Sequence, residues 1–544
     1  MDEHAQQPRI EVQDVDHLGI VAGIVDEIGL VEEIDRQLGT HPQEHLSCGQ
    51  AVKAMILNGL GFLSGPLYLF EEFFVGKATE HLIGTGIRPQ HLNDDKLGRV
   101  LDKLFETDLS EVFVGVAMKA ARRFGISPSS VHLDATSLHL HGEYSEDDQE
   151  GPAAIRITHG YSRDRRPDLK QFVVDLLCTG EGGVPLFLRV ADGNEADQAV
   201  FASLLKDLRA RIDLDALFVA DSALYGAKNL SLLGNLRWLC RVPRTLEQAR
   251  RVLAQTPREA FVQSDLHEGY RITELENEYG GIKQRWLVVH SAQLEKAAGE
   301  RLHRRLEHRE RELDRELSRL GRKTFACRAD ARGATEAFTT EHLGKHHRLA
   351  DPEIVPVARY GKKRGRPAKG TEPEEIRYRI KAELKRDEAF ISEELRRSGC
   401  YILATNVTDK EELSGDQLLA EYKDQHSVER GFRFLKDPLF FTSSVFVKSP
   451  RRVAAIAMVM GLCLLVYALG ERMLRRALQE AGTEVRHQTG KPTDRPTLRW
   501  VFQIFQAVHL LRVDGTEQIA NLSGERECIL RHFGRASQRY YLLC

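Results

Sequence analysis

The feature that most constrains the fold is a change, near Ser130, in the spacing of the apolar residues. Upstream they recur every three to four positions, and downstream they alternate or form short runs bounded by glycine. Three such runs are followed by a helical pattern and then by two more runs. This order predicts a mixed α/β sheet with flanking helices. The predicted strands are Val131–Leu140, Gln171–Cys178, Val184–Val190, Leu217–Ala220 and Leu236–Val242, and the predicted helices are Ala196–Ile212 and Ala227–Leu233.

The N-terminal residues 1–126 predict an all-α domain. The whole chain has 544 residues, which is enough for two to four domains. Helical spacing is found in Gly49–Leu63, Leu67–Val75 and Lys96–Phe105, and Asn93 can cap the third of these helices. Short helices joined by tight turns fit a DNA-binding helix-turn-helix or a plain helical bundle.

A long insertion, residues 246–398, interrupts the predicted sheet. It contains a strand pair, Tyr270–Glu278 and Gln284–His290, and then a charged helix, Leu294–Leu320. Leucines at coiled-coil spacing along this helix predict packing on its own domain, or contact with a second subunit or with DNA. The predicted sheet therefore has two parts, residues 127–245 and residues 399–475.

A basic segment near the end of the insertion places Gly365 between Arg364 and Arg366. Such a segment suits insertion into a narrow A·T minor groove, as AT-hook segments do. A charged flexible linker is the alternative. Both interpretations are kept.

The C-terminal part begins with a return to the strand pattern at Gly399–Asn406. Val453–Leu469 is uncharged and apolar, so a membrane span must be weighed against a buried helix. It is shorter than the roughly 20 residues that a span requires, which favours a helix buried against the sheet and no membrane contact. Residues 476–544 predict a helical C-terminal region.

Charge and cysteine content narrow the class of protein. The formal net charge of −3 means that any DNA-binding charge must be local. The eight cysteines include no Cys-x-x-Cys pair, and no secretory signal precedes the first domain. Reduced thiols, a cytoplasmic location and the absence of a zinc site are therefore expected.

The segment from Tyr422 to Lys436 carries a polar stripe if it forms one helix. Offsets of −7, −4, 0, +4 and +7 place Tyr422, Gln425, Glu429, Arg433 and Lys436 on one face. A buried face would be apolar, so this one is expected to carry chemistry. A glycine inside a helix costs about 1 kcal/mol, and Gly431 therefore indicates a close approach, with phosphate backbone as one candidate.

Three carboxylates stand out by their positions. Asp134 lies in the middle of the first predicted strand, where an acid is costly to bury. Asp221 follows the strand Leu217–Ala220, at the strand end that favours ligand sites, and Glu429 lies on the helix after the last strand. Three oxygen donors favour Mg²⁺ or Mn²⁺, and two such ions would suit phosphoryl transfer.

The ordered acids and the helical segment resemble the DDE transposases of bacterial insertion sequences, in the branch with a Y-x2-R-x3-E-x6-K signature. Tyr422, Glu429 and Lys436 match that signature in register, and Gln425 replaces its arginine. The resemblance covers residues 130–245 and 399–475. It implies a ribonuclease-H-like five-stranded core, metal binding by Asp134, Asp221 and Glu429, and phosphate contacts by Tyr422 and Lys436.

The resemblance also implies partners and a reaction. These are cleavage of double-stranded DNA at transposon ends, strand transfer into target DNA, and a homodimer in the synaptic complex. Because an uncharged amide at Gln425 cannot grip phosphate as arginine does, Lys423, Arg430 or Arg433 is expected to take that contact. A nuclease without strand transfer and a non-catalytic regulator remain alternatives. Trp238 and Trp286 could stack on a flipped base or pack in the core.

Overall fold

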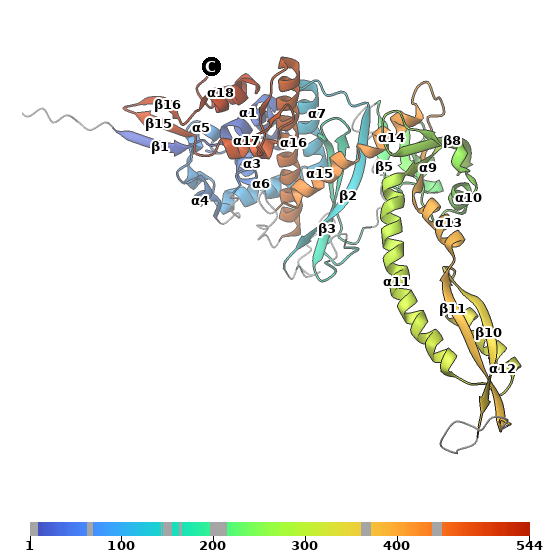
Figure 1. Cartoon of the computed structure of the whole chain (residues 1–544). Coiled ribbons are helices and arrows are strands. Elements are labelled where there is room, and N and C mark those ends of the chain that lie inside the picture. The colour runs from blue at the N-terminus through green and yellow to red at the C-terminus, as the bar shows by residue number, and fades with distance from the viewer. Residues whose placement is uncertain are drawn as a thin grey trace, which may run out of the picture.

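The fold is built on a nine-stranded sheet, and a long arm projects from it (Figure 1). The strand order is β4-β3-β2-β5-β6-β12-β9-β8-β7. The predicted mixed α/β class is confirmed, and the sheet is larger than the five strands predicted. The computed structural model describes residues 9–62, 69–142, 144, 155–162, 166–195, 215–360, 372–437 and 449–544.

Five strands from residues 127–245 make up one end of the sheet. β2 pairs antiparallel with β3, which pairs antiparallel with β4, while β2, β5 and β6 run parallel. Every strand predicted in this part of the chain is present, and so is the short helix α9. The predicted helix Ala196–Ile212 lies outside the described residues. The bounds are β2 (Ser130–Leu140), β3 (Lys170–Thr179), β4 (Pro185–Ala191), β5 (Leu217–Ala220), β6 (Trp238–Arg241) and α9 (Ala227–Leu233).

Strands from the insertion continue the same sheet. β12 pairs with β6 on one side and β9 on the other, and β8 and β7 follow. Every residue of β12 is buried, and its pairing satisfies backbone groups that β6 would otherwise expose at an edge. The predicted strand pair is therefore confirmed, as part of the main sheet. The bounds are β7 (Val262–Gln263), β8 (Tyr270–Tyr279), β9 (Ile282–Ser291) and β12 (Cys400–Thr405).

The arm consists of the rest of the insertion except α10, which packs on the sheet against β12 (Figure 1). Its predicted charged helix is α11, and the leucine stripe is partly buried: Leu302 and Leu306 pack against Ile391 of α13. α11 also packs along β11, so this helix packs on its own domain. The antiparallel pair of β10 and β11 was not predicted. The bounds are α10 (Glu247–Gln255), α11 (Ala292–Arg322), α12 (Arg328–Glu341), β10 (His347–Arg359), β11 (Glu375–Arg386) and α13 (Glu388–Ser398).

The N-terminal region is mainly helical, as predicted, but it is not all-α. Its strand β1 pairs with β15 of the C-terminal region, which in turn pairs with β16. The predicted cap is present, because the Asn93 side chain accepts a hydrogen bond from the Lys96 amide at 2.9 Å. The bounds are β1 (Ile10–Asp14), α1 (Leu18–Ile28), α2 (Leu30–Leu38), α3 (Cys48–Gly59), α4 (Phe70–Phe74), α5 (Thr79–Ile83), α6 (Asp94–Glu106) and α7 (Leu109–Arg123).

The C-terminal region mixes helices with two short strand pairs, so the prediction of a helical region is only partly correct. β15 and β16 join β1 in a three-stranded sheet, and β13 pairs with β14. The bounds are β13 (Val485–Arg486), β14 (Pro492–Thr493), α17 (Leu498–Ile504), β15 (His509–Val513), β16 (Thr516–Ala520), α18 (Gly524–Arg531) and α19 (Arg535–Arg539).

The apolar segment after the last core strand forms the central helix α16 (Pro450–Ala481). By length and composition α16 could cross a membrane, but 94% of its most apolar window is buried inside the molecule. It packs against α1, α3, α6 and α7 and against β4 of the sheet. The prediction of a helix buried against the sheet is confirmed, and α16 joins the N-terminal helices to the core.

A polar cluster ties the two ends of the chain together. Lys53 of α3 lies 2.6 Å from Asp26 of α1, and Asp26 also accepts hydrogen bonds from Tyr540 and Arg539 at 2.5 and 2.8 Å. The Lys53 side chain is only 3% exposed. A buried lysine is stabilised only while its partner is charged, so the whole cluster depends on Asp26.

Asp26→Ala should therefore lower the free energy of unfolding by about 3 kcal/mol, because it leaves the buried Lys53 ammonium with the neutral Tyr540 hydroxyl at 2.9 Å and no acidic partner. Thermal or urea unfolding followed by circular dichroism measures the loss. The matched control is Arg476→Ala, which removes the exposed pair between Arg476 and Glu480 and should cost less than about 1 kcal/mol. Equal losses in the two variants would contradict a buried cluster.

Candidate active site

Asp134 and Asp221 occupy neighbouring positions on two parallel strands. The register of β2 and β5 pairs Leu133 with Ala220, so the next residues on the two strands are these aspartates. Asp221 comes directly after β5, at the carboxyl end of that strand. Ligand sites of α/β sheets favour this edge. The structure thus brings together two of the three predicted acids.

The face of the sheet that carries Asp134 is covered by the helix that carries Glu429. Asp134 pairs with Leu176 across the ladder, and directly opposed residues share a face. Leu176 lies in one hydrophobic core with Val428 and Phe432 of α15 (His426–Leu435), which packs on β2 and β3. Glu429 is exposed on this helix. All three acids therefore belong to one side of the sheet.

Each of the two aspartates accepts a hydrogen bond from a backbone amide close to it in the chain. A carboxylate oxygen of Asp134 accepts a hydrogen bond from the Ala135 amide at 2.8 Å, and one of Asp221 accepts from the Ala223 amide at 2.7 Å. Burial, and then the charge of the nearby aspartate, raises the pKa of the thiols of Cys178 and Cys240. Both thiols therefore stay protonated and do not compete with the carboxylates as metal ligands.

The donor set suits a hard divalent cation, because carboxylate oxygens are the ligands that Mg²⁺ and Mn²⁺ prefer. Across residues 9–544, leaving out the undescribed gaps, no group of three or more His, Cys, Asp or Glu side chains is arranged to hold a metal ion. The structure therefore provides a pair of aspartates that fits such an ion and leaves Glu429 on the helix above them.

The predicted single helix from Tyr422 to Lys436 is wrong. Two helices occupy this segment, α14 (Gly415–Lys423) and α15, and Gln425 is the N-terminal cap of the second. The Gln425 amide donates to the Tyr422 carbonyl at 3.4 Å, a bond over three residues that tightens the turn. The polar run of Asp424, Gln425 and His426 has weak helix propensity overall, which permits the break.

Arg241 lies close to the predicted acids and was not predicted from the sequence. The register of β5 and β6 pairs Ala220 with Cys240, so Arg241 comes next to Asp221. Its guanidinium lies 5.0 Å from the centroid of the Tyr401 ring and close enough to Tyr422 to influence the pKa of that phenol. Burial raises the pKa of Tyr422, while Arg241 lowers it. The position of Arg241 at the end of a strand parallel to that of Asp221 was the signal available in the sequence.

The other residues predicted to bind DNA lie at α15, on α14 or outside the described residues. Arg433 is exposed on α15, and Lys436 is the C-terminal cap of that helix. Lys423, an expected substitute for the missing arginine, instead lies over the Tyr270 ring with its ammonium 4.2 Å from the ring centroid. Arg364 and Arg366 lie outside the described residues.

Packing explains Gly431 and both tryptophans, Trp238 and Trp286. A Cβ on Gly431 would come within 3.1 Å of Leu464, so this glycine allows α15 to approach α16. Phosphate is not needed to explain it. Trp238 and Trp286 are 1% and 0% exposed, and the Trp286 indole donates to Gln284 at 3.0 Å. The core interpretation of both tryptophans is therefore confirmed.

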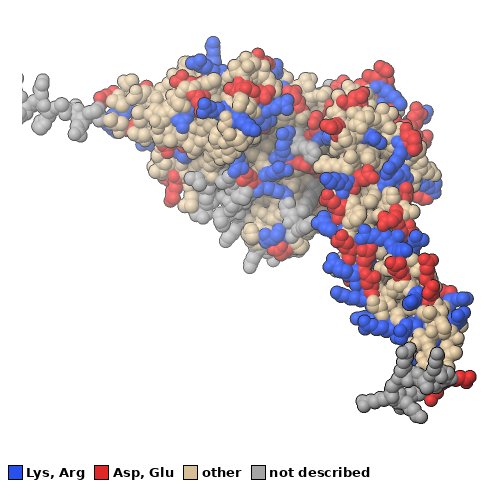
Figure 2. Space-filling view, in the orientation of Figure 1, with Lys and Arg blue, Asp and Glu red and all other residues tan. Residues whose placement is uncertain are grey.

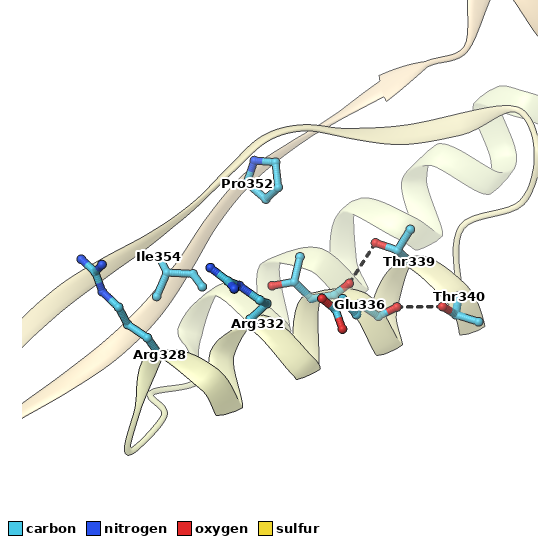
Figure 3. A pocket seen from close by; sticks show the side chains of 8 residues that line it. Arg328, Arg332, Glu336, Thr339, Thr340, Pro352 and Ile354 are labelled. Carbon is cyan, nitrogen blue, oxygen red and sulfur yellow. Dashed lines mark hydrogen bonds between the residues drawn. The ribbon is translucent and has the colours of Figure 1, made fainter.

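A pocket on the arm does not belong to this site. It lies between α12 and β10, where Arg328 and Arg332 come from the helix and Pro352 and Ile354 from the strand (Figure 3). The threonines along α12 hydrogen-bond carbonyl groups of their own helix. None of the three acids lines this pocket.

Comparison with known proteins gives two family matches and a similar solved structure. A family described as "Transposase DDE domain" matches residues 127–466, and one described as "Domain of unknown function (DUF4277)" matches residues 10–118. No curated protein matches the chain. A solved structure described as a cryo-EM structure of the piggyBac transposase synaptic complex with hairpin DNA is similar, with 8% identity and a TM-score of 0.37 over 87% of this chain and 79% of that chain.

The transposase family match covers more than half of the chain, and it includes Asp134, Asp221 and Glu429. The chain therefore belongs to the DDE transposase family.

Proposed function

We propose that this transposase cuts double-stranded DNA at the ends of its own mobile element and joins the freed 3′-hydroxyl to target DNA. The observation that carries the proposal is the position of Asp134 and Asp221, each directly after a paired residue of the parallel strands β2 and β5, on the face of the sheet that the helix of Glu429 covers. We assign all three residues to the catalytic site. Two ions of Mg²⁺ or Mn²⁺ held there would stabilise the attacking and leaving oxygens of phosphoryl transfer.

The fold supports this assignment through its strand order. Strands β4-β3-β2-β5-β6 place two antiparallel hairpin strands beside three parallel ones, the arrangement that a ribonuclease-H-like core requires. In such a core the acids sit at the carboxyl ends of central strands. Asp221 fits that position, and Asp134 lies beside it.

The remaining assignments follow from the family. We propose that the protein belongs to a bacterial insertion sequence and acts in the cytoplasm, where DNA is accessible. The N-terminal helices would bind the DNA ends, and two copies would act together in a synaptic complex. Tyr422, Gln425, Arg433 and Lys436 would contact the DNA near the cleaved phosphate, and Arg364 and Arg366 would contact it from the arm.

This chain has Gln425 where the family signature has an arginine. Arg241 would supply the missing cation. This arginine reaches Tyr422 from the strand beside Asp221. A guanidinium at that position can hold a phosphate oxygen next to the acids, as a cation on the helix would.

Arg241→Gln should lower DNA cleavage about 10- to 100-fold, because one charge-assisted contact to phosphate is lost. Adding Gln425→Arg to that variant should restore part of the activity, since it returns a cation to the position that the signature favours. Initial rates of end cleavage at saturating DNA measure both effects. Full activity of Arg241→Gln would show that the arginine only supports Tyr422.

The alternative is a nuclease of the same fold that cuts but does not join. A plasmid that carries the gene with its natural flanking DNA tests the first step. With Mg²⁺ the purified protein should release a fragment with defined ends at the element boundaries, and chelation of the metal should stop the reaction. Cuts scattered along the plasmid would favour a nuclease, and no cuts at all would favour a regulator that only binds DNA.

A further inference from the structure

One side of α11 is a continuous basic surface, which we call the basic stripe. At 100° per residue its members fall within an arc of about 80° over six helical turns. Every one of them is exposed. The basic stripe consists of Arg301, Arg304, His308, Arg311, Arg315, Arg319 and Arg322.

The arginines of the basic stripe have no acidic partners in the described parts of the chain: none of the six forms a salt bridge there. Other arginines of the same helix do, as Arg305 lies 3.2 Å from Glu394 and Arg309 lies 2.9 Å from Glu312. Like charges three or four residues apart destabilise a helix by about 0.2–0.5 kcal/mol per pair. Within the described residues no salt bridge of these arginines offsets this repulsion, while His308 of the basic stripe lies 3.8 Å from Glu312.

The basic stripe points away from the core of the arm. The buried leucines of α11, Leu302, Leu306 and Leu313, lie on the opposite side of the helix and pack towards α13 and β11. In Figure 1 α11 forms the edge of the arm nearer the body of the molecule. Figure 2 shows Lys and Arg side chains along that edge, across an open space from the body.

The length of the basic stripe fits a duplex. Its ends are 21 residues apart, which at 1.5 Å per residue is about 31 Å. One turn of B-form DNA is about 34 Å long. A flank of exposed acids borders the basic stripe, namely Glu300, Glu307 and Asp314, at heptad spacing. We call these the acidic flank. They border one side of the basic stripe, and Glu312 and Glu316 lie beyond its other side.

We propose that the basic stripe binds the phosphate backbone of double-stranded DNA that lies between the arm and the body. This inference rests on the proposed function and adds a surface that the three acids do not define. Guanidinium groups pair well with phosphate oxygens, and backbone contacts of this kind position a duplex without reading its sequence. The contact should therefore be independent of sequence and sensitive to salt.

The test compares three full-length triple variants with the wild type. The first removes charge from the basic stripe (Arg304→Gln, Arg311→Gln, Arg315→Gln). The second neutralises the acidic flank (Glu300→Gln, Glu307→Gln, Asp314→Asn). The third is a matched control with the same charge change as the first, in exposed arginines of three separate helices outside the N-terminal region (Arg250→Gln, Arg531→Gln, Arg535→Gln). Glutamine keeps a good helix propensity, so α11 should still form.

Fluorescence anisotropy with a labelled duplex of mixed sequence, about 40 base pairs long, measures the affinity between 50 and 200 mM salt. The first variant should bind roughly 10- to 100-fold more weakly at low salt, with a salt slope smaller by about 2 to 3. The second should bind more tightly, and the control should resemble the wild type. Equal weakening of the first variant and the control would overturn the proposal, because net charge alone would explain it.

Two further outcomes would also count against it. Unchanged DNA binding by the first variant, together with loss of dimers in sedimentation, would assign the basic stripe to a second copy of the chain. Unchanged binding with unchanged dimers would leave it without this role. Neither result bears on the assignment of the three acids to the catalytic site, because end cleavage by the wild type and by variants of the acids is measured separately.

Discussion

Asp134→Asn and Asp221→Asn should each lower metal-dependent cleavage of DNA at least roughly 1000-fold. An amide cannot supply the charge that a divalent cation requires, and removing metal stabilisation of the transition state costs several kcal/mol, where about 1.4 kcal/mol is tenfold. Rates of end cleavage under single-turnover conditions, with Mg²⁺ or Mn²⁺, measure the loss. Binding of duplex DNA should change little, because the aspartates carry no positive charge.

The same variants separate a catalytic role from a structural one. Two carboxylates at neighbouring positions repel each other, so each asparagine should keep or raise the melting temperature in metal-free buffer. Asp215→Asn is the matched control, since Asp215 lies before β5, at the opposite end of the same strand, and its side chain is 97% exposed. Residual cleavage above about one tenth of the wild-type rate in either variant would remove that aspartate from the site.

Glu429→Gln should lower cleavage about as much as loss of either aspartate. The structure leaves Glu429 exposed on α15, which covers the face that carries Asp134. The proposed role of Glu429 requires its carboxylate to lie beside the two aspartates when metal and DNA are bound. If the Glu429 carboxylate acts only when metal and DNA are bound, Glu429→Gln should lower the cleavage rate and leave the stability of the free protein unchanged.

Glu421→Gln on the preceding helix is the control for this prediction. Glu421 is partly buried on α14 and lines a pocket near the start of β5, at the other edge of the sheet. This variant should cleave at the wild-type rate. If Glu429→Gln cleaved equally well, the third acid would have to be sought elsewhere, and the match of Tyr422 and Lys436 to the family signature would lose its meaning.

The parts of the fold that were predictable depend on local patterns. The strands that carry Asp134 and Asp221 were found to within a residue or two, because buried strands read as apolar runs between turns. The burial of α16 was predictable because Val453–Leu469 is too short to span a bilayer and too apolar to lie on the surface of the protein. The two aspartates could therefore be paired from sequence once their strands were taken as neighbours.

Other features depend on contacts between distant parts of the chain. The break between Tyr422 and Glu429 is stabilised by packing of α14 on β5 and β6 and of α15 on β2 and β3, which no spacing rule contains. The pairing of β1 with β15 joins residues about 500 positions apart in the chain. Arg241 was missed because the sequence did not show that the end of β6 meets Tyr422.

The most direct test of the central claim is joining of element ends to a target. Purified protein, Mg²⁺, a labelled DNA fragment that ends at the element boundary and an unlabelled plasmid would be incubated together, and the junctions sequenced. We expect labelled plasmid whose junctions join the 3′ end of the element to many target sites, and no such product with Asp134→Asn. Cleaved ends that are never joined to the plasmid, under conditions where cleavage is complete, would contradict it.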